Sequence, residues 1–182
     1  MSSPARTAVV PLPAGREGRV AAAGLSGFLV IACLVRFGPG AEALVAGFFA
    51  AVLVLLSVID LERRIIPNRI VLPATAIVLL ANVARDPDRA PEWILAAVGA
   101  GLFFLVPLLV YPSGIGMGDV KLALLLGAGL GLAVVPALVV GLCAAFVVAV
   151  ALLVRGGAEA RKTAIPFGPL LSFGAIVALL FM

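Results

Sequence analysis

Long apolar runs without charge dominate this chain and decide what it can fold into. The longest lies between Lys121 and Arg155 and contains no charged residue. Charged residues make up 12% of the chain, about half the fraction of ordinary soluble proteins, and the mean hydropathy is +1.28. Such a chain belongs in a lipid bilayer, where backbone polar groups must be paired within the protein. The runs do not alternate apolar and polar residues as barrel strands do, so the sequence predicts an all-α polytopic membrane protein.

Polar breaks between the apolar runs predict six to seven transmembrane helices. Residues 1–19 are polar and rich in proline and arginine, and a disordered tail is expected there. Residues 20–182 are expected to form one transmembrane helical domain. The long run after Lys121 is expected to be two short spans, because Gly127, Gly131 and Pro136 offer a break. The predicted spans are 20–36, 42–60, 66–84, 93–111, 118–132, 135–154 and 164–182.

The basic residues predict how these spans are oriented. If the turn at 60–66 is cytoplasmic, all but Arg36, Arg85 and Arg89 of the 13 basic residues fall on the cytoplasmic side. The N-terminus is then cytoplasmic and the C-terminus outside, in a multi-pass protein of the inner membrane. The net charge of +4 is explained by this topology signal, so no nucleic-acid partner is expected.

Two aspartates at the edges of apolar runs are the candidates for chemistry. Asp60 closes the second predicted span and Asp119 opens the fifth. A charged group at the centre of a membrane helix costs about 2.5–3.5 kcal/mol, so such residues mark functional sites and usually have a partner. The chain has no histidine, and Cys33 and Cys143 stand alone in apolar runs. The natural partner of each aspartate is therefore the other one.

A pair of close carboxylates can hydrolyse a peptide bond without a metal. The two cannot both ionise cheaply, so one keeps its proton. The ionised group can then activate a water while the protonated group donates to the attacked carbonyl. Two other interpretations remain open from the residues alone. The aspartates can be interfacial or helix-capping residues, or they can carry protons or ions across the membrane.

Three short motifs in separate predicted spans carry a family resemblance. The segment Asp60-Leu-Glu-Arg-Arg-Ile-Ile-Pro-Asn68 resembles the first catalytic motif of the type IV prepilin peptidases. The segment Gly116-Met-Gly-Asp-Val-Lys-Leu122 resembles the Gly-x-Gly-Asp signature of intramembrane aspartyl proteases. Pro166-Phe-Gly-Pro169 resembles a third family stretch. The resemblance covers about residues 43–182 and leaves 1–40 without a clear counterpart. It implies that Asp60 and Asp119 are the catalytic pair.

Residues around these motifs are expected to bind substrate or support the site: Glu62, Arg63, Arg64, Pro67, Asn68, Gly116, Gly118, Lys121, Pro166 and Gly168. The two arginines either steer an acidic residue of the substrate or anchor the membrane topology. Asn68 is expected to order the turn rather than to touch substrate. Lys121 lies about 200° around a helix from Asp119, so its side chain is expected to face elsewhere.

The resemblance also implies a reaction and a partner. The family cuts the basic leader from prepilin-like or preflagellin-like proteins at the cytoplasmic membrane face. Many members carry a Cys-x-x-Cys insertion and also methylate the new N-terminus. This chain lacks the insertion and resembles the short, peptidase-only form, so neither cofactor nor metal is expected. Glu62 stands where some members have a second aspartate, and whether it assists stays open. A proton-relay transporter and a catalytically silent pilus-assembly subunit are the alternative functions.

Overall fold

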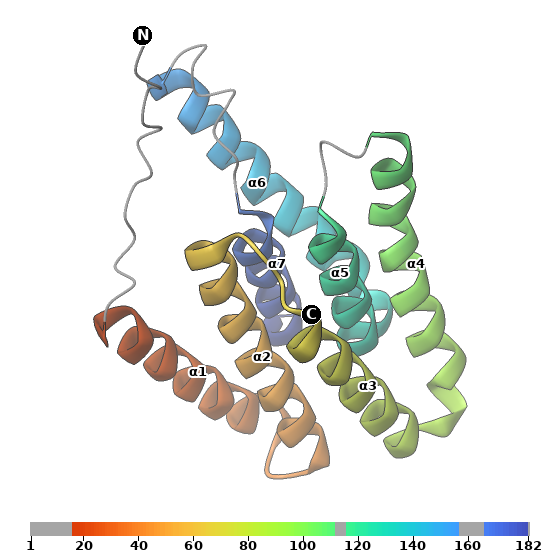
Figure 1. Ribbon diagram of the computed structural model, residues 1–182. Helices are drawn as coiled ribbons and strands as arrows, with labels where there is room; N and C mark the ends of the chain where they lie inside the picture. The colour runs from red at the N-terminus through yellow and green to blue at the C-terminus, as the bar shows by residue number, and fades with distance from the viewer. Residues whose placement is uncertain (1–15, 112–115, 157–165, 182) are drawn as a thin grey trace, which may run out of the picture.

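The computed structural model describes residues 16–111, 116–156 and 166–181, and it is helical, as the sequence predicts (Figure 1). The elements in chain order are α1 Arg16–Phe37, α2 Ala41–Arg63, α3 Asn68–Arg85, the 3-10 turn η1 Pro87–Arg89, α4 Ala90–Val110, α5 Met117–Leu130, the 3-10 turn η2 Gly131–Ala133, α6 Val134–Gly156 and α7 Phe167–Phe181. Each of these α-helices corresponds to one predicted span. The protein is therefore an all-α, multi-pass membrane protein.

The helix boundaries differ from the prediction at several places: α2 ends three residues later than predicted, at Arg63, α4 begins three residues earlier, at Ala90, and α7 begins three residues later, at Phe167. Helix α1 begins at Arg16, so residues 16–19 are helical and do not belong to the predicted tail. A helix can continue past the apolar part of its sequence, because its backbone bonds do not require apolar side chains. Residues 1–15 lie outside the described part of the chain. Helix α3 begins at Asn68 rather than 66, with Pro67 as its N-cap.

The long uncharged run is broken at η2, where two spans were predicted. By length and composition alone, Met117–Arg155 counts as a single membrane-spanning stretch, one of five in the described residues. Gly131 interrupts it with φ +57 and ψ −136, a conformation that is essentially restricted to glycine. Helix α6 turns back from there toward the end of the molecule at which α5 begins (Figure 1). The predicted break of this run into two helices is confirmed.

Side chains from two neighbouring helices satisfy backbone groups at this break. The side-chain amide of Asn82 in α3 donates to the carbonyl oxygen of Ala128 at 2.9 Å. The backbone N–H of Leu132 donates to Glu92 of α4 at 3.3 Å. An unpaired backbone group that is buried away from water costs free energy, so these bonds lower the cost of the break between α5 and α6.

The core lies around α5, which packs against α3, α4 and α7. Its fully buried side chains include Leu122, Leu125 and Leu126. Helix α1 lies at the edge of the bundle along α2 and contributes Leu29 and Cys33 to a separate small cluster. The catalytic candidates therefore lie on the central helices rather than on the peripheral one.

The contact between α4 and α5 depends on a missing side chain at Gly127. A Cβ atom there would collide with the backbone carbonyl of Ala96, so the two helices approach at the backbone level, as small residues permit in membranes. Gly131, which was predicted to offer a break in the run, forms the η2 turn.

Gly127→Ala is expected to destabilise the protein by about 1–3 kcal/mol, because the close α4–α5 contact must open. The matched control is Gly99→Ala on α4, where a Cβ would meet nothing within 4 Å. Alanine in a helix interior is about 0.5–1 kcal/mol more favourable than glycine, so this variant should melt at or above the wild-type temperature. Thermal unfolding of both variants in detergent provides the measurement. Equal melting temperatures would contradict the packing account.

Candidate active site

Asp60 lies in the last turn of α2 and is 7% exposed. The helix ends at Arg64, whose backbone N–H donates to the carbonyl oxygen of Asp60 itself at 2.8 Å. Arg64 adopts a left-handed conformation with φ 54, which costs a non-glycine residue about 1–2 kcal/mol. The turn that follows α2 is therefore closed by a hydrogen bond to the backbone of Asp60.

The side chain of Asp60 is held by the start of α7. The backbone N–H of Gly168 donates to Oδ2 of Asp60 at 3.0 Å in a buried bond between residues 108 positions apart. Helix α7 begins at Phe167, so this N–H is one of the donors that a helix N-terminus leaves without an intrahelical partner. The carboxylate of Asp60 thus caps another helix.

Asp119 lies in the first turn of α5 and caps its own helix. The N–H of Gly116, the N-cap residue, donates to Oδ2 of Asp119 at 3.3 Å. Gly116 is extended, with φ −87 and ψ 146. Each aspartate therefore has one carboxylate oxygen bound by a backbone N–H at a helix start.

Both aspartates line one pocket of about 360 Å³. Its other lining residues come from the α2–α3 connection and the start of α5: Arg64, Ile65, Ile66, Gly116, Met117, Gly118 and Lys121. Two segments almost 60 residues apart in sequence thus contribute one carboxylate each to a common space. This space is large enough to hold water molecules beside both groups.

The structure divides the remaining predicted site residues into two groups. Arg64, Gly116, Gly118 and Lys121 line the pocket with the aspartates. Glu62, Arg63, Pro67, Asn68 and Pro166 do not line it, and the first two are exposed. The expectation that Lys121 faces elsewhere is wrong, because its long side chain reaches back to the pocket and donates to Oδ1 of Asn68 at 2.7 Å.

Three apolar pocket residues were not predicted: Ile65, Ile66 and Met117. Ile65 and Met117 are about half exposed, at 54% and 50%. Each lies inside a motif segment, between residues that were selected for their polarity or small size. An apolar residue in a membrane protein attracts no attention by its type, so only its position within the motifs could have indicated it.

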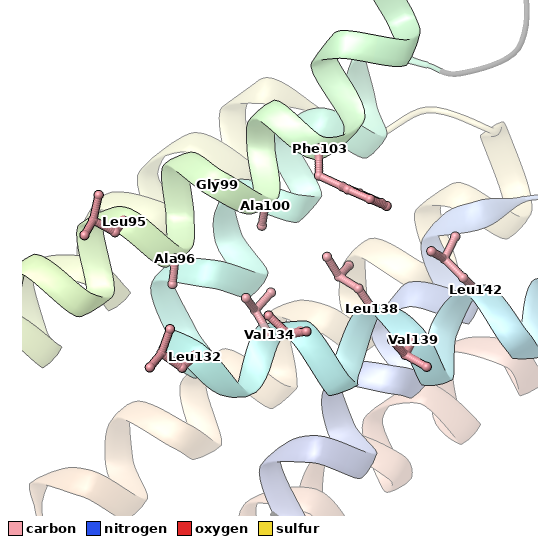
Figure 2. Close-up of a pocket in the computed structure, with 11 residues that line it drawn as sticks. Leu95, Ala96, Gly99, Ala100, Phe103, Leu132, Val134, Leu138, Val139 and Leu142 are labelled. Atoms are coloured by element: carbon pink, nitrogen blue, oxygen red, sulfur yellow. The ribbon is translucent and has the colours of Figure 1, made fainter.

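A second space of about 360 Å³ lies between α4 and α6 and has no acidic residue in its lining. Figure 2 shows Ala100 and Phe103 of α4 on one side of this space and Leu138 of α6 on the other. All the residues that line it are apolar. The chemistry must therefore be sought at the aspartates.

Comparison with known families identifies the relationship of the chain. Residues 47–154 match the model of the type IV leader peptidase family, and this segment contains both aspartates. The chain belongs to that family.

Individual proteins with known names match most of the chain, beyond the segment that the family model covers. A prepilin leader peptidase/N-methyltransferase of Bacillus subtilis is 31% identical over 84% of the chain and 64% of the relative. Proteins of the same name from Burkholderia pseudomallei and Pseudomonas putida are 33% and 34% identical, over 86% and 80% of the chain and 52% of each relative. The chain thus spans about half to two thirds of the length of these relatives. No solved structure matches it.

The alignments change one expectation from the sequence. A match over 84% of the chain is longer than residues 43–182 alone. The likeness to the leader peptidases therefore reaches into the first predicted span, and residues 1–40 do not lack a counterpart throughout.

Gly168→Ala is expected to lower the activity of the site about a hundredfold, because a Cβ there would lie 2.7 Å from Oδ2 of Asp60 and displace the carboxylate. The measurement is the turnover of purified protein in detergent at matched folded concentration. Gly116→Ala is the comparison: its Cβ would lie 3.5 Å from Oδ2 of Asp119, an ordinary contact, so its loss should be much smaller. Similar losses in both variants would contradict this geometric account.

Proposed function

We propose that this protein is a membrane aspartyl endopeptidase that removes the leader peptide of prepilin-like substrates at the cytoplasmic membrane face. The observation that carries the proposal is the shared pocket of Asp60 and Asp119, two carboxylates at the ends of membrane helices. Membership of the type IV leader peptidase family supports it, and so do relatives named prepilin leader peptidases.

The pocket supports a hydrolysis in which the two carboxyl groups share one proton. The ionised group takes a proton from a water, and the water oxygen attacks the carbonyl carbon of the scissile peptide bond. The protonated group donates to the carbonyl oxygen. When the tetrahedral intermediate collapses, the C–N bond breaks and a proton passes to the leaving amine. Two carboxyl groups and one water molecule account for every proton and bond in this hydrolysis.

The backbone bonds to the aspartates suit this chemistry. Each N–H binds Oδ2, and no protein donor to either Oδ1 is found in the described part of the chain. An N–H bond favours the charged form of a carboxylate and fixes its orientation. One oxygen of each group is therefore held, while the other is left to water and substrate.

The buried interior gives less support to a proton-relay transporter. Such a pathway needs polar side chains or waters that continue across the membrane. In the described residues, the buried polar side chains are Asp60, Asn82 and Ser172, and the core around α2 and α5 is apolar. The aspartates form a pocket near the ends of their helices, which is better suited to a reaction than to passage.

The variants Asp60→Asn and Asp119→Asn are each expected to reduce leader cleavage below detection, because an amide can neither accept the water proton nor share a proton with its neighbour. The assay co-expresses the protein with a prepilin-like substrate in a host without other leader peptidases and follows the loss of the leader on a gel. Glu62→Gln is the matched control. Glu62 is exposed and does not line the pocket, so this variant should cleave normally. Near-normal cleavage by either Asp→Asn variant would exclude that residue from catalysis.

Two finer properties are proposed from the sequence and are measured in the same assay. The described residues contain no group of three possible metal ligands, and we expect cleavage to be insensitive to chelators. We also expect a product whose new N-terminus carries no methyl group, by mass spectrometry. A methylated product would exclude the peptidase-only form.

The proposed topology places the 60–66 turn and the α5 start in the cytoplasm. In a background without Cys33 and Cys143, Arg63→Cys should react with a membrane-impermeant thiol reagent only after the cells are opened, whereas Asp88→Cys should react in intact cells. A label at position 158, which lies outside the described residues, should behave like one at 63. Labelling at position 63 in intact cells would reverse the orientation.

A further inference from the structure

Lys121 connects the two segments that carry the aspartates. Its Nζ donates to Oδ1 of Asn68 at 2.7 Å, between residues 53 positions apart. Asn68 is the first residue of α3, and Lys121 lies two residues after Asp119 in α5. The bond therefore ties the start of α3 to the first turns of α5, beside the pocket.

A second contact ties the same two segments on the other side of Asp119. A Cβ at Gly118 would lie 3.1 Å from Cβ of Ile66, tighter than most real contacts. The side chain of Ile66 therefore rests directly on the α5 backbone, next to Asp119. The α2–α3 connection is thus held against α5 at two points, one before and one after the aspartate.

The connection held in this way begins at the other aspartate. Arg64 closes α2 by donating its N–H to the carbonyl oxygen of Asp60, and its left-handed conformation starts the path toward Ile66 and Asn68. A shift of this connection along α5 would move the last turn of α2, and with it Asp60. The two contact points are therefore placed to set the separation of the aspartates.

We propose that Lys121 is a positioning residue of the catalytic pair, which acts through Asn68 to fix Asp60 relative to Asp119. This inference rests on the proposed peptidase function, and it adds a role for a side chain that does not itself take part in proton transfer. The chemistry of the partner fits that role. An amide oxygen orients the ammonium group but, unlike a carboxylate, would add no third negative charge beside the pair.

The test is a double-mutant cycle of Lys121→Met, Asn68→Ala and the combined variant. Methionine keeps most of the side-chain length but cannot donate. We expect each single variant to lower kcat about threefold to tenfold, in line with one lost hydrogen bond, with KM changed less than about twofold. The combined variant should be no slower than the slower single variant, because both changes remove the same contact. Lys121→Arg keeps a donor and should recover most of the activity.

Arg69→Met is the matched control, because Arg69 is an exposed basic residue next to Asn68 that does not line the pocket. Its kcat should equal that of the wild type. The same proteins are melted in detergent, so that kcat is compared at equal folded fraction.

Several results would overturn the inference. An unchanged kcat in Lys121→Met would remove the positioning role. A rise in KM alone would make Lys121 a substrate contact. Additive losses of kcat in the combined variant would show that Lys121 and Asn68 act independently and not through their hydrogen bond. A lower melting temperature with normal kcat would leave only a structural role. If the wild-type protein itself does not cleave the substrate, the proposed function fails, and that outcome is distinct from all of these.

Discussion

The buried bond between the N–H of Gly168 and Oδ2 of Asp60 is the contact on which the site depends. An aspartate at the end of a membrane helix must be either solvated or bonded, since a bare carboxylate is costly in an apolar environment. Here the start of α7 supplies the donor, and the carboxylate in turn satisfies a helix end that would otherwise lack a partner. One hydrogen bond therefore satisfies both the carboxylate of Asp60 and the free N–H at the start of α7, and it holds α7 against α2 beside the pocket. This explains how a chain with so few charges can keep an acidic residue 7% exposed.

The same requirement shapes the opposite end of α5. The η2 turn separates α5 from α6, and Asn82 and Glu92 bind backbone groups of Ala128 and Leu132 beside it. Asn82 and Glu92 are therefore structural polar residues, even though buried polar groups in membrane proteins often mark function. Asp60 and Asn82 are both buried and both bonded to backbone. What separates them is the pocket: Asp60 shares one with a second carboxylate, whereas Asn82 spans two packed helices.

The sequence predicted the helices well because the signal for a membrane span is local: apolar length, basic flanks and breaks at Gly and Pro. It also selected Asp60 and Asp119, which stand out against apolar runs. The direction of side chains was harder to predict. Lys121 was expected to point away from the site on helical phase alone, but a long flexible side chain reaches around a short helix end. The bond from Gly168 to Asp60 joins residues 108 positions apart, and no periodicity or spacing could have revealed it.

The two glycines of the Gly-x-Gly-Asp segment have different physical reasons to be glycine. At Gly116 the backbone has φ −87, which any residue can adopt, and a Cβ would make an ordinary contact with Asp119. What this position supplies is its N–H, which every residue but proline possesses. At Gly118 a Cβ would press against Ile66, so this position supplies the absence of a side chain. The first glycine serves the aspartate of its own helix. The second serves the approach of the chain that carries the other aspartate, and only at that second position would a side chain require Ile66 to shift.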